Sequence, residues 1–230
     1  MFVLKIIIIL IVITVLILFI ARKEIAVIKK KDPAIKSSIE VLLYPSFWAM
    51  ASHRIAHRFY RMHLYFIARL ISQLSRILTG IEIHPGAKIG SGVFIDHGMG
   101  VVIGETCEIG DNVLIYQGVT LGGTGKETGK RHPTVMSNVM IGTGAKVLGP
   151  ITIGADSKIG GGSVVLRDVP PYSTVVGVPG RVVRRSDTST IPSDTLDQLR
   201  FPDPVEMEIC KLRVEIDKLK KELDKVKAND

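Results

Sequence analysis

The sequence contains little cysteine and few aromatic residues. Cys107 and Cys210 are the only cysteines among 230 residues and lie far apart, so no disulfide framework supports the fold and a reducing compartment is expected. Hydrophobic residues make up 46% and charged residues 23% of the chain, which excludes a collagen and a disordered polymer. Glycine is absent before Gly80 and after Gly180, so all 22 glycines fall within one middle region.

Charge and hydrophobicity are also unevenly distributed. Between Arg22 and Arg76, 11 Lys or Arg residues accompany 3 Asp or Glu residues, an excess of eight that equals the formal net charge of the whole chain, +8. The chain therefore divides into an apolar leader (1–21), a basic helical region (22–80), a glycine-punctuated domain (81–185), a linker (186–204) and a charged C-terminal helix (205–228).

The leader has the length and composition of a membrane span. Thr14 is the only polar residue in Ile6–Ala21, and Phe2–Lys5 extends the segment to about 20 residues, enough to cross a bilayer core. Basic residues after the leader outweigh Lys5, so the positive-inside rule predicts a membrane anchor with the rest of the chain in the cytoplasm. A buried hydrophobic helix is the alternative.

The basic region has the spacing of helices. Apolar residues recur at helical intervals from Ser46 to Leu78, and Gly80 fits a helix C-terminus. Its basic residues suit a membrane surface or a nucleic acid, and the adjacent leader favours the membrane, so no nucleic-acid partner is expected. His53 and His57 lie one helical turn apart, but no third metal ligand is evident nearby, which favours packing roles.

Aliphatic residues recur every six positions in the middle domain, a period that marks a parallel β-helix. With three faces in each coil, the repeated units predict about four coils. Cys107 falls at the fifth position of a unit, where small buried side chains belong, so it is expected in the core. The repeated units begin at Ile83, Ile89, Ile95, Ile103, Ile109, Ile115, Leu121, Ile141, Val147, Ile153, Ile159 and Val165.

Two interruptions of the repeat carry most of the chemistry-bearing side chains. The step from Ile95 to Ile103 is eight residues, so two residues are inserted, and this insertion carries Asp96 and His97. The step from Leu121 to Ile141 is twenty residues, which predicts a loop of fourteen extra residues around Arg131-His132. Regular units need only stack, so residues that break the period are free to act on a ligand.

These motifs together resemble the bacterial serine O-acetyltransferases in their short form, which are hexapeptide acyltransferases with a left-handed β-helix. The resemblance covers about residues 30 to 205. It implies an all-β, left-handed parallel β-helix, preceded here by the transmembrane helix and short helical region and followed by the C-terminal helix. The matching stretches are Asp32–Ala34, His53–His57, Ile83–Ala87, Ile95–Gly98, Val102–Thr106, Gly118–Lys126, Arg131–Pro133 and Gly177–Pro179.

The resemblance also implies a reaction, in which the hydroxyl of L-serine attacks the thioester of acetyl-CoA. His97 matches the family's general base, and Glu82 stands where the longer members usually have an aspartate that supports this histidine. The residues that match the serine-binding set are Asp32, Asp96, Arg131 and His132. An arginine suits the carboxylate of the substrate, and an aspartate suits its ammonium group.

The co-substrate implied by the resemblance is acetyl-CoA, and no metal is expected. Gly122, Gly123 and Thr124 match the stretch near the thioester, while Thr143, Lys146 and Lys158 lie where the family binds CoA. The family's β-helix is a homotrimer with active sites between subunits, and its feedback inhibitor, cysteine, occupies the serine site.

The tail has the pattern of a short coiled coil. Ile and Leu at its two core positions slightly favour dimers, whereas the resemblance implies a trimer; an amphipathic helix packed on the β-helix is the alternative. The chain ends Ala228-Asn229-Asp230 rather than in isoleucine, which argues against a complex with O-acetylserine sulfhydrylase, the next enzyme of cysteine synthesis. The core positions are Val205, Ile209, Leu212, Ile216, Leu219, Leu223 and Val226.

Three other functions compete with serine acetylation. A sugar or other hydroxyl acetyltransferase would use the same fold, but Asp96-His97 and Arg131-His132 favour an amino-acid acceptor. A zinc-dependent β-helix carbonic anhydrase would need His84, His97 and His132 to converge. A non-catalytic membrane-tethered scaffold would not need these side chains.

Overall fold

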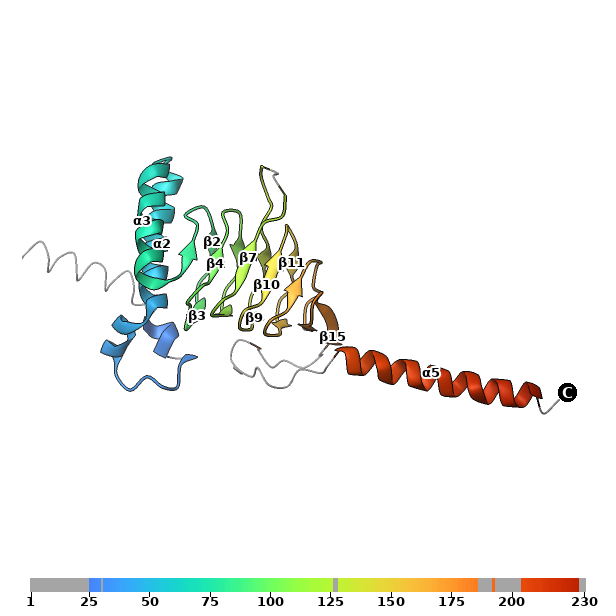
Figure 1. Cartoon of the computed structure of the whole chain (residues 1–230). Coiled ribbons are helices and arrows are strands. Elements are labelled where there is room, and N and C mark those ends of the chain that lie inside the picture. Colours follow the sequence, from blue (N-terminus) through green and yellow to red (C-terminus); the bar gives the residue numbers. More distant parts are fainter. Residues whose placement is uncertain (1–24, 30, 126–127, 186–191, 193–203, 228–230) are drawn as a thin grey trace, which may run out of the picture.

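The computed structural model describes residues 25–29, 31–125, 128–185, 192 and 204–227. A short helical region leads into a stack of β-strands, and one long helix follows the stack (Figure 1).

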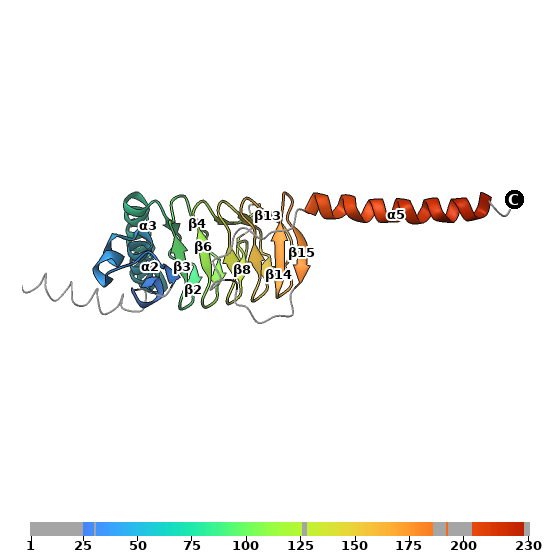
Figure 2. The same ribbon diagram turned by 90° about the horizontal axis from the view of Figure 1, so that it is seen from below.

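The helices η1 (Ser38–Leu43), α2 (Pro45–Arg61) and α3 (Tyr65–Thr79) precede the strands, and residues 25–29 are also helical. The helical spacing from 46 to 78 is interrupted between α2 and α3, where His63 adopts a left-handed conformation (φ 62°). Gly80 ends α3 with φ 71°, which confirms the predicted glycine C-cap. Both helices lie against the first coil of strands (Figure 2).

The strands form three sheets, and the chain visits them in rotation. The first sheet contains β1 (Glu82–Ile83), β4 (Val102–Ile103), β7 (Thr120–Gly122), β10 (Lys146–Leu148) and β13 (Val164–Val165). The second contains β2 (Lys88–Ile89), β5 (Glu108–Ile109), β8 (Thr134–Val135) and β11 (Thr152–Ile153). The third contains β3 (Phe94–Asp96), β6 (Leu114–Tyr116), β9 (Met140–Ile141), β12 (Lys158–Ile159), β14 (Ser173–Val176) and β15 (Arg181–Arg185).

Each strand pairs in parallel with the strand one coil away, except that β15 runs antiparallel to β14. The predicted parallel β-helix is therefore confirmed.

The number of coils and the length of the long loop differ from the predictions. Val135 lies on β8 between β5 and β11, so it begins a regular unit inside the segment that the repeat assigns to the loop. The step from Leu121 to Val135 is fourteen residues, of which six belong to a regular unit and eight are inserted. Val169 bridges to Ile153 and Val175 pairs with Ile159, which completes a fifth coil instead of about four.

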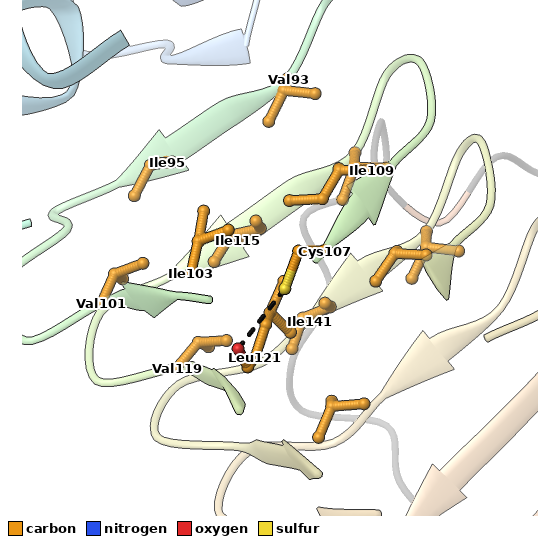
Figure 3. Close-up of a cluster of buried hydrophobic side chains, with 14 of the residues drawn as sticks. Val93, Ile95, Val101, Ile103, Cys107, Ile109, Ile115, Val119, Leu121 and Ile141 are labelled. Atoms are coloured by element: carbon orange, nitrogen blue, oxygen red, sulfur yellow. Dashed lines mark hydrogen bonds between the residues drawn. The ribbon is translucent and has the colours of Figure 1, made fainter. Parts of the chain in front are cut away.

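The aliphatic residue of each unit points into the centre of the β-helix (Figure 3). Ile95, Ile103 and Leu121 are completely buried, as is Cys107, whose Sγ donates a hydrogen bond to the carbonyl oxygen of Leu121 at 3.5 Å. Burial raises the pKa of the Cys107 thiol to about 12, so it is protonated at neutral pH and a poor nucleophile. The prediction that Cys107 is a core residue is confirmed.

The predicted fold class is wrong in one component, the transmembrane helix. Within the part of the chain that the structure describes, no helix is both long and apolar enough to cross a membrane. Residues 1–21, where hydropathy predicts that helix, lie outside the described residues. At the other end of the chain, α5 (Pro204–Lys227) projects away from the last coil (Figures 1 and 2).

Candidate active site

The predicted site residues lie mainly at two corners of the β-helix. One corner precedes the strands of the first sheet, and the other follows them. The Asp96 corner, residues 96–101, leads from β3 into β4. The Arg131 corner, residues 104–107, 123–125 and 128–133, lies where β4 and β7 lead into the second sheet. One chain therefore holds the predicted base and the predicted arginine clamp at separate corners.

His97 projects from the Asp96 corner into solvent. Its backbone is left-handed, with φ 58°, and its side chain is 74% exposed. Its Nε2 lies 3.9 Å from Oδ1 of Asp96. The following Gly98 packs tightly beneath the turn, since a Cβ there would lie 2.4 Å from Cδ1 of Ile81. The insertion thus presents an accessible imidazole on a turn that is closely packed underneath.

Asp96 has a second carboxylate, that of Asp32, near it. Burial raises the pKa of Asp96, and the neighbouring charge of Asp32 raises it further, while His97 opposes the shift. Asp32 accepts hydrogen bonds from the hydroxyl of Tyr44 and, at 2.7 Å, from the backbone N–H of Ala34. The bond to Asp32 raises the pKa of Tyr44 to about 12, so its hydroxyl stays a donor. Such a carboxylate pair suits a positively charged ligand group.

Glu82 lies on β1 and is held by the helix that covers it. Its carboxylate oxygens lie 3.3 Å from Nη1 of Arg76 and 3.7 Å from Nη2 of Arg69, both on α3. No contact among the described residues joins Glu82 to His97. The structure therefore does not bring the predicted histidine–carboxylate pair together within this chain.

Arg131 is anchored by a carboxylate from the preceding coil. Its Nη2 donates to Oε2 of Glu105 at 2.6 Å, and the hydroxyl of Tyr60 donates to Oε1 at 2.9 Å. The bond from Arg131 lowers the pKa of Glu105, so this carboxylate stays charged and fixes the guanidinium. The same region contains a cavity of about 370 Å³ lined by Tyr60, Tyr65, Arg69, His84, Pro85 and Glu105.

His132 is fixed by the residue that follows Glu105. The backbone N–H of Thr106 donates to Nδ1 of His132 at 3.2 Å, and the Thr106 hydroxyl lies 2.9 Å from the same nitrogen. That hydroxyl oxygen also accepts from the backbone N–H groups of Arg131 and His132, each at 3.1 Å. Burial lowers the pKa of His132, which favours the neutral ring, and because Nδ1 accepts from the Thr106 N–H, the proton of the neutral ring lies on Nε2.

The predicted acetyl-CoA residues are spread over the β-helix. A Cβ on Gly123 would lie 3.3 Å from Nε2 of His132, so Gly123 and Thr124 belong to the Arg131 corner, and Gly122 ends β7 directly before them. Lys146 of β10 donates from Nζ to the carbonyl oxygen of Gly118 at 2.6 Å and to Oγ1 of Thr120 at 3.1 Å. Thr143 lies just before β10, where the strands of the first sheet begin, as does His97 two coils earlier. Lys158 lies on β12 of the third sheet.

The three histidines of the zinc alternative do not converge within one chain. His84 and His132 lie on the side of the first sheet where its strands end, near Arg131, whereas His97 lies where those strands begin. His84 accepts a hydrogen bond at Nδ1 from the backbone N–H of Gly86, at 3.0 Å. Across the described ranges, no group of three or more His, Cys, Asp or Glu residues could hold a metal ion.

Tyr44, Glu105 and Thr106 contact predicted site residues, although the sequence pattern indicates no role for them. Glu105 and Thr106 stand 26 residues before Arg131 and His132, one coil away at the same corner. The repeat could have revealed that stacking, had Val135 been recognised as the start of a unit. Tyr44 has no comparable signal, because it reaches Asp32 from outside the repeat.

Comparisons with known proteins agree with this architecture. Residues 132–167 match the family model described as bacterial transferase hexapeptide (six repeats). The serine acetyltransferase of Bacillus subtilis is 60% identical over 185 residues, which cover 80% of this chain and 84% of that protein. The chain belongs to the serine acetyltransferase family. The serine acetyltransferase of Synechococcus elongatus is 61% identical over 178 residues, or 77% of this chain and 72% of that protein.

Solved structures of the serine acetyltransferase family share the fold. The crystal structure of the Vibrio cholerae serine acetyltransferase superposes with a TM-score of 0.76 at 43% identity, over 80% of this chain and 71% of that one. A serine acetyltransferase in complex with cysteine superposes with a TM-score of 0.77 at 42% identity, over 80% of this chain and 72% of that one.

Proposed function

We propose that this chain transfers the acetyl group of acetyl-CoA to the hydroxyl of L-serine, giving O-acetyl-L-serine and CoA, a step in cysteine biosynthesis. The observation that carries the proposal is 60% identity over most of the chain to proteins named serine acetyltransferase. Residues 81–185 form the catalytic domain in this proposal. In this proposal the reaction takes place in the cytoplasm.

His97 is the general base of the proposed reaction. A serine hydroxyl is a weak nucleophile at neutral pH, and an accessible imidazole removes its proton as it attacks the thioester carbonyl carbon. The tetrahedral intermediate then expels the CoA thiolate, which takes the proton back from the imidazolium. Glu82 is the carboxylate proposed to orient the ring, and it must exchange its contacts with Arg69 and Arg76 to do so.

The serine substrate is held by groups from both corners. Asp32 and Asp96 receive its ammonium, and Arg131, with His132 beside it, receives its carboxylate. Because these corners lie at opposite ends of the first-sheet strands, the proposed site combines the Asp96 corner of one subunit with the Arg131 corner of a neighbour in a homotrimer. Cysteine carries the same ammonium and carboxylate, so we expect it to compete for this site.

Acetyl-CoA approaches the same boundary between subunits in this proposal. The small residues Gly122 and Gly123, with Thr124, leave backbone N–H groups open to the oxyanion that develops on the thioester. Thr143, Lys146 and Lys158 supply polar and positively charged groups for the CoA moiety. No step of the proposed mechanism requires a metal.

The release of CoA, measured as free thiol with and without L-serine, tests the function. We expect serine-dependent release, and a loss of about 10²–10⁴-fold in His97→Ala, because a positioned base contributes that much. His63→Ala is the matched control, since His63 is exposed beyond the end of α2. Release that depends on a sugar instead of serine would support the alternative hydroxyl acetyltransferase and contradict the proposal.

A further inference from the structure

Helix α5 presents an apolar stripe to solvent. The helix spans 24 residues, or about 36 Å, and Arg181 of β15 binds Glu208 near its start. Beyond that contact the helix projects away from the β-helix (Figures 1 and 2). Its described core positions are 45 to 64% exposed, namely Val205, Ile209, Leu212, Ile216 and Leu219. Packing on the chain's own β-helix therefore does not cover this stripe.

The charges beside the stripe are sorted by sign. With Ile209 and Ile216 at position a and Leu212 and Leu219 at position d of the heptad, each g position holds glutamate: Glu208, Glu215 and Glu222. The e positions that follow each of these by five residues are all basic: Arg213, Lys220 and Lys227. In a parallel, in-register coiled coil, a g residue of one helix faces the e residue five places later on its neighbour.

Helix direction decides whether these charges attract or repel. Parallel helices place Glu215 opposite Lys220 of the neighbouring copy, and the two flanking pairs are also of opposite charge. Antiparallel helices pair g with g and e with e, which would place glutamate opposite glutamate and one basic residue opposite another. The sequence of α5 is thus complementary to itself in one direction only.

We propose that α5 is a self-association element, whose apolar stripe packs in parallel and in register against the α5 helices of other copies of this chain. The partner is a second copy because the stripe supplies its own complementary charges on both sides. This inference does not depend on the proposed enzymatic activity.

Disulfide formation between copies tests direction and register together. In the full-length Cys210→Ser background, two separate variants, Leu212→Cys and Leu219→Cys, each place one thiol at a d position. The two positions lie about 10 Å apart along the helix. Parallel in-register helices bring both thiols against their own counterparts, whereas an antiparallel pair can do so at one position at most. Val214→Cys is the matched control, because Val214 lies opposite the seam and is 67% exposed. Cys107 is buried and remains in every variant.

After mild oxidation with copper phenanthroline, non-reducing electrophoresis should show chains of doubled mass for both d-position variants and little for Val214→Cys. Crosslinking at only one d position, at neither, or equally at Val214 would overturn the proposal.

Charge exchange provides a second, independent measurement. In the Leu219→Cys chain, Glu215→Lys places like charges across the seam, and we expect the crosslinked fraction to fall about threefold, the size of effect typical of an exposed ion pair. Adding Lys220→Glu restores opposite charges and should restore the yield. Asp217→Lys makes the same change of charge away from the seam and should leave the yield unchanged. Equal yields in all variants would contradict the predicted g–e pairing.

Discussion

At the scale of single residues, Glu105 determines where the Arg131 guanidinium points, since it binds Arg131 on one oxygen and Tyr60 on the other. Glu105→Gln keeps the size of the side chain but removes its charge. We expect the KM for L-serine to rise about tenfold with a smaller change in kcat, because a hydrogen bond to a charged group contributes roughly 1.5 kcal/mol.

Steady-state kinetics with serine as the varied substrate measures this separation of KM from kcat. Glu108→Gln is the matched control, because Glu108 of β5 binds Lys88 of the adjacent strand β2 on the surface. An unchanged KM in Glu105→Gln would mean that Arg131 does not depend on Glu105 for its position.

His53 makes the stability of the fold depend on pH. It is buried in α2 with Nδ1 unpaired, and burial lowers its pKa from 6.5 to about 3. Between these values the unfolded chain binds a proton that the folded chain does not, so stability falls as the pH drops below 6.5. At pH 5 the contribution of His53 is a loss of about 2 kcal/mol in the free energy of unfolding relative to pH 7.

Urea unfolding of the wild type and His53→Leu at pH 7 and pH 5 measures this effect. We expect the difference in unfolding free energy between the two pH values to shrink by about 2 kcal/mol in the variant. The exposed His63→Leu should retain it. The same pH dependence in His53→Leu as in the wild type would show that another group is responsible.

At the scale of elements, the six-residue period predicted most strands and both corners, because an inward aliphatic residue is required at every unit. It failed at Val135, where Met136 follows instead of the glycine found after many other units and Pro133 precedes the strand, so the unit lacks the usual signal. His97, Arg131 and His132 were recognisable because they lie where the period breaks. Glu105 and Thr106, the partners of Arg131 and His132, lie in a regular unit, and only the stacking of successive coils brings these residues together.

The close stacking of coils also predicts the effect of a small substitution. A Cβ on Gly104 would lie 1.9 Å from Cδ2 of His132, so Gly104→Ala must displace that ring. Because the backbone of Gly104 is not left-handed, we expect the fold to persist while serine-dependent CoA release falls at least tenfold, the effect of misplacing a substrate-holding side chain.

The double variant Gly104→Ala with His132→Ala identifies the cause. If displacement of His132 explains the loss, the double variant should be no less active than His132→Ala alone, with circular dichroism unchanged throughout. Additive losses would show that Gly104 acts through another neighbour.

At the scale of the whole molecule, both ends of the β-helix are covered by other elements. Arg54 of α2 donates to the carbonyl oxygens of Ile89 and Gly90 at 2.7 and 2.8 Å, and Ser72 of α3 donates to that of Ile83 at 2.7 Å. At the other end, β15 pairs with β14. Such caps protect the exposed backbone of a terminal coil. The two corners of the proposed site lie on the sides of the β-helix, between these capping elements.

A site shared between subunits predicts that two inactive variants complement each other. His97→Ala removes the base from the Asp96 corner, and Arg131→Ala removes the clamp from the other corner, so each alone should have little activity. In oligomers assembled from equal amounts of both chains, about a quarter of the boundaries combine an intact His97 with an intact Arg131, because each corner is intact with a chance of one half.

Co-expression of the two variants under different affinity tags, followed by purification through both tags, isolates the mixed oligomers. This purification removes trimers made of one variant only, and in each remaining trimer one boundary in three combines both intact residues, so we expect serine-dependent CoA release at about a third of the wild-type rate per site. Simple mixing of the separately assembled variants is the control and should give none without subunit exchange. If both corners of a site came from one chain, every site would lack one residue and the mixed oligomers would stay inactive, so the rate distinguishes a shared site from one built within a single subunit.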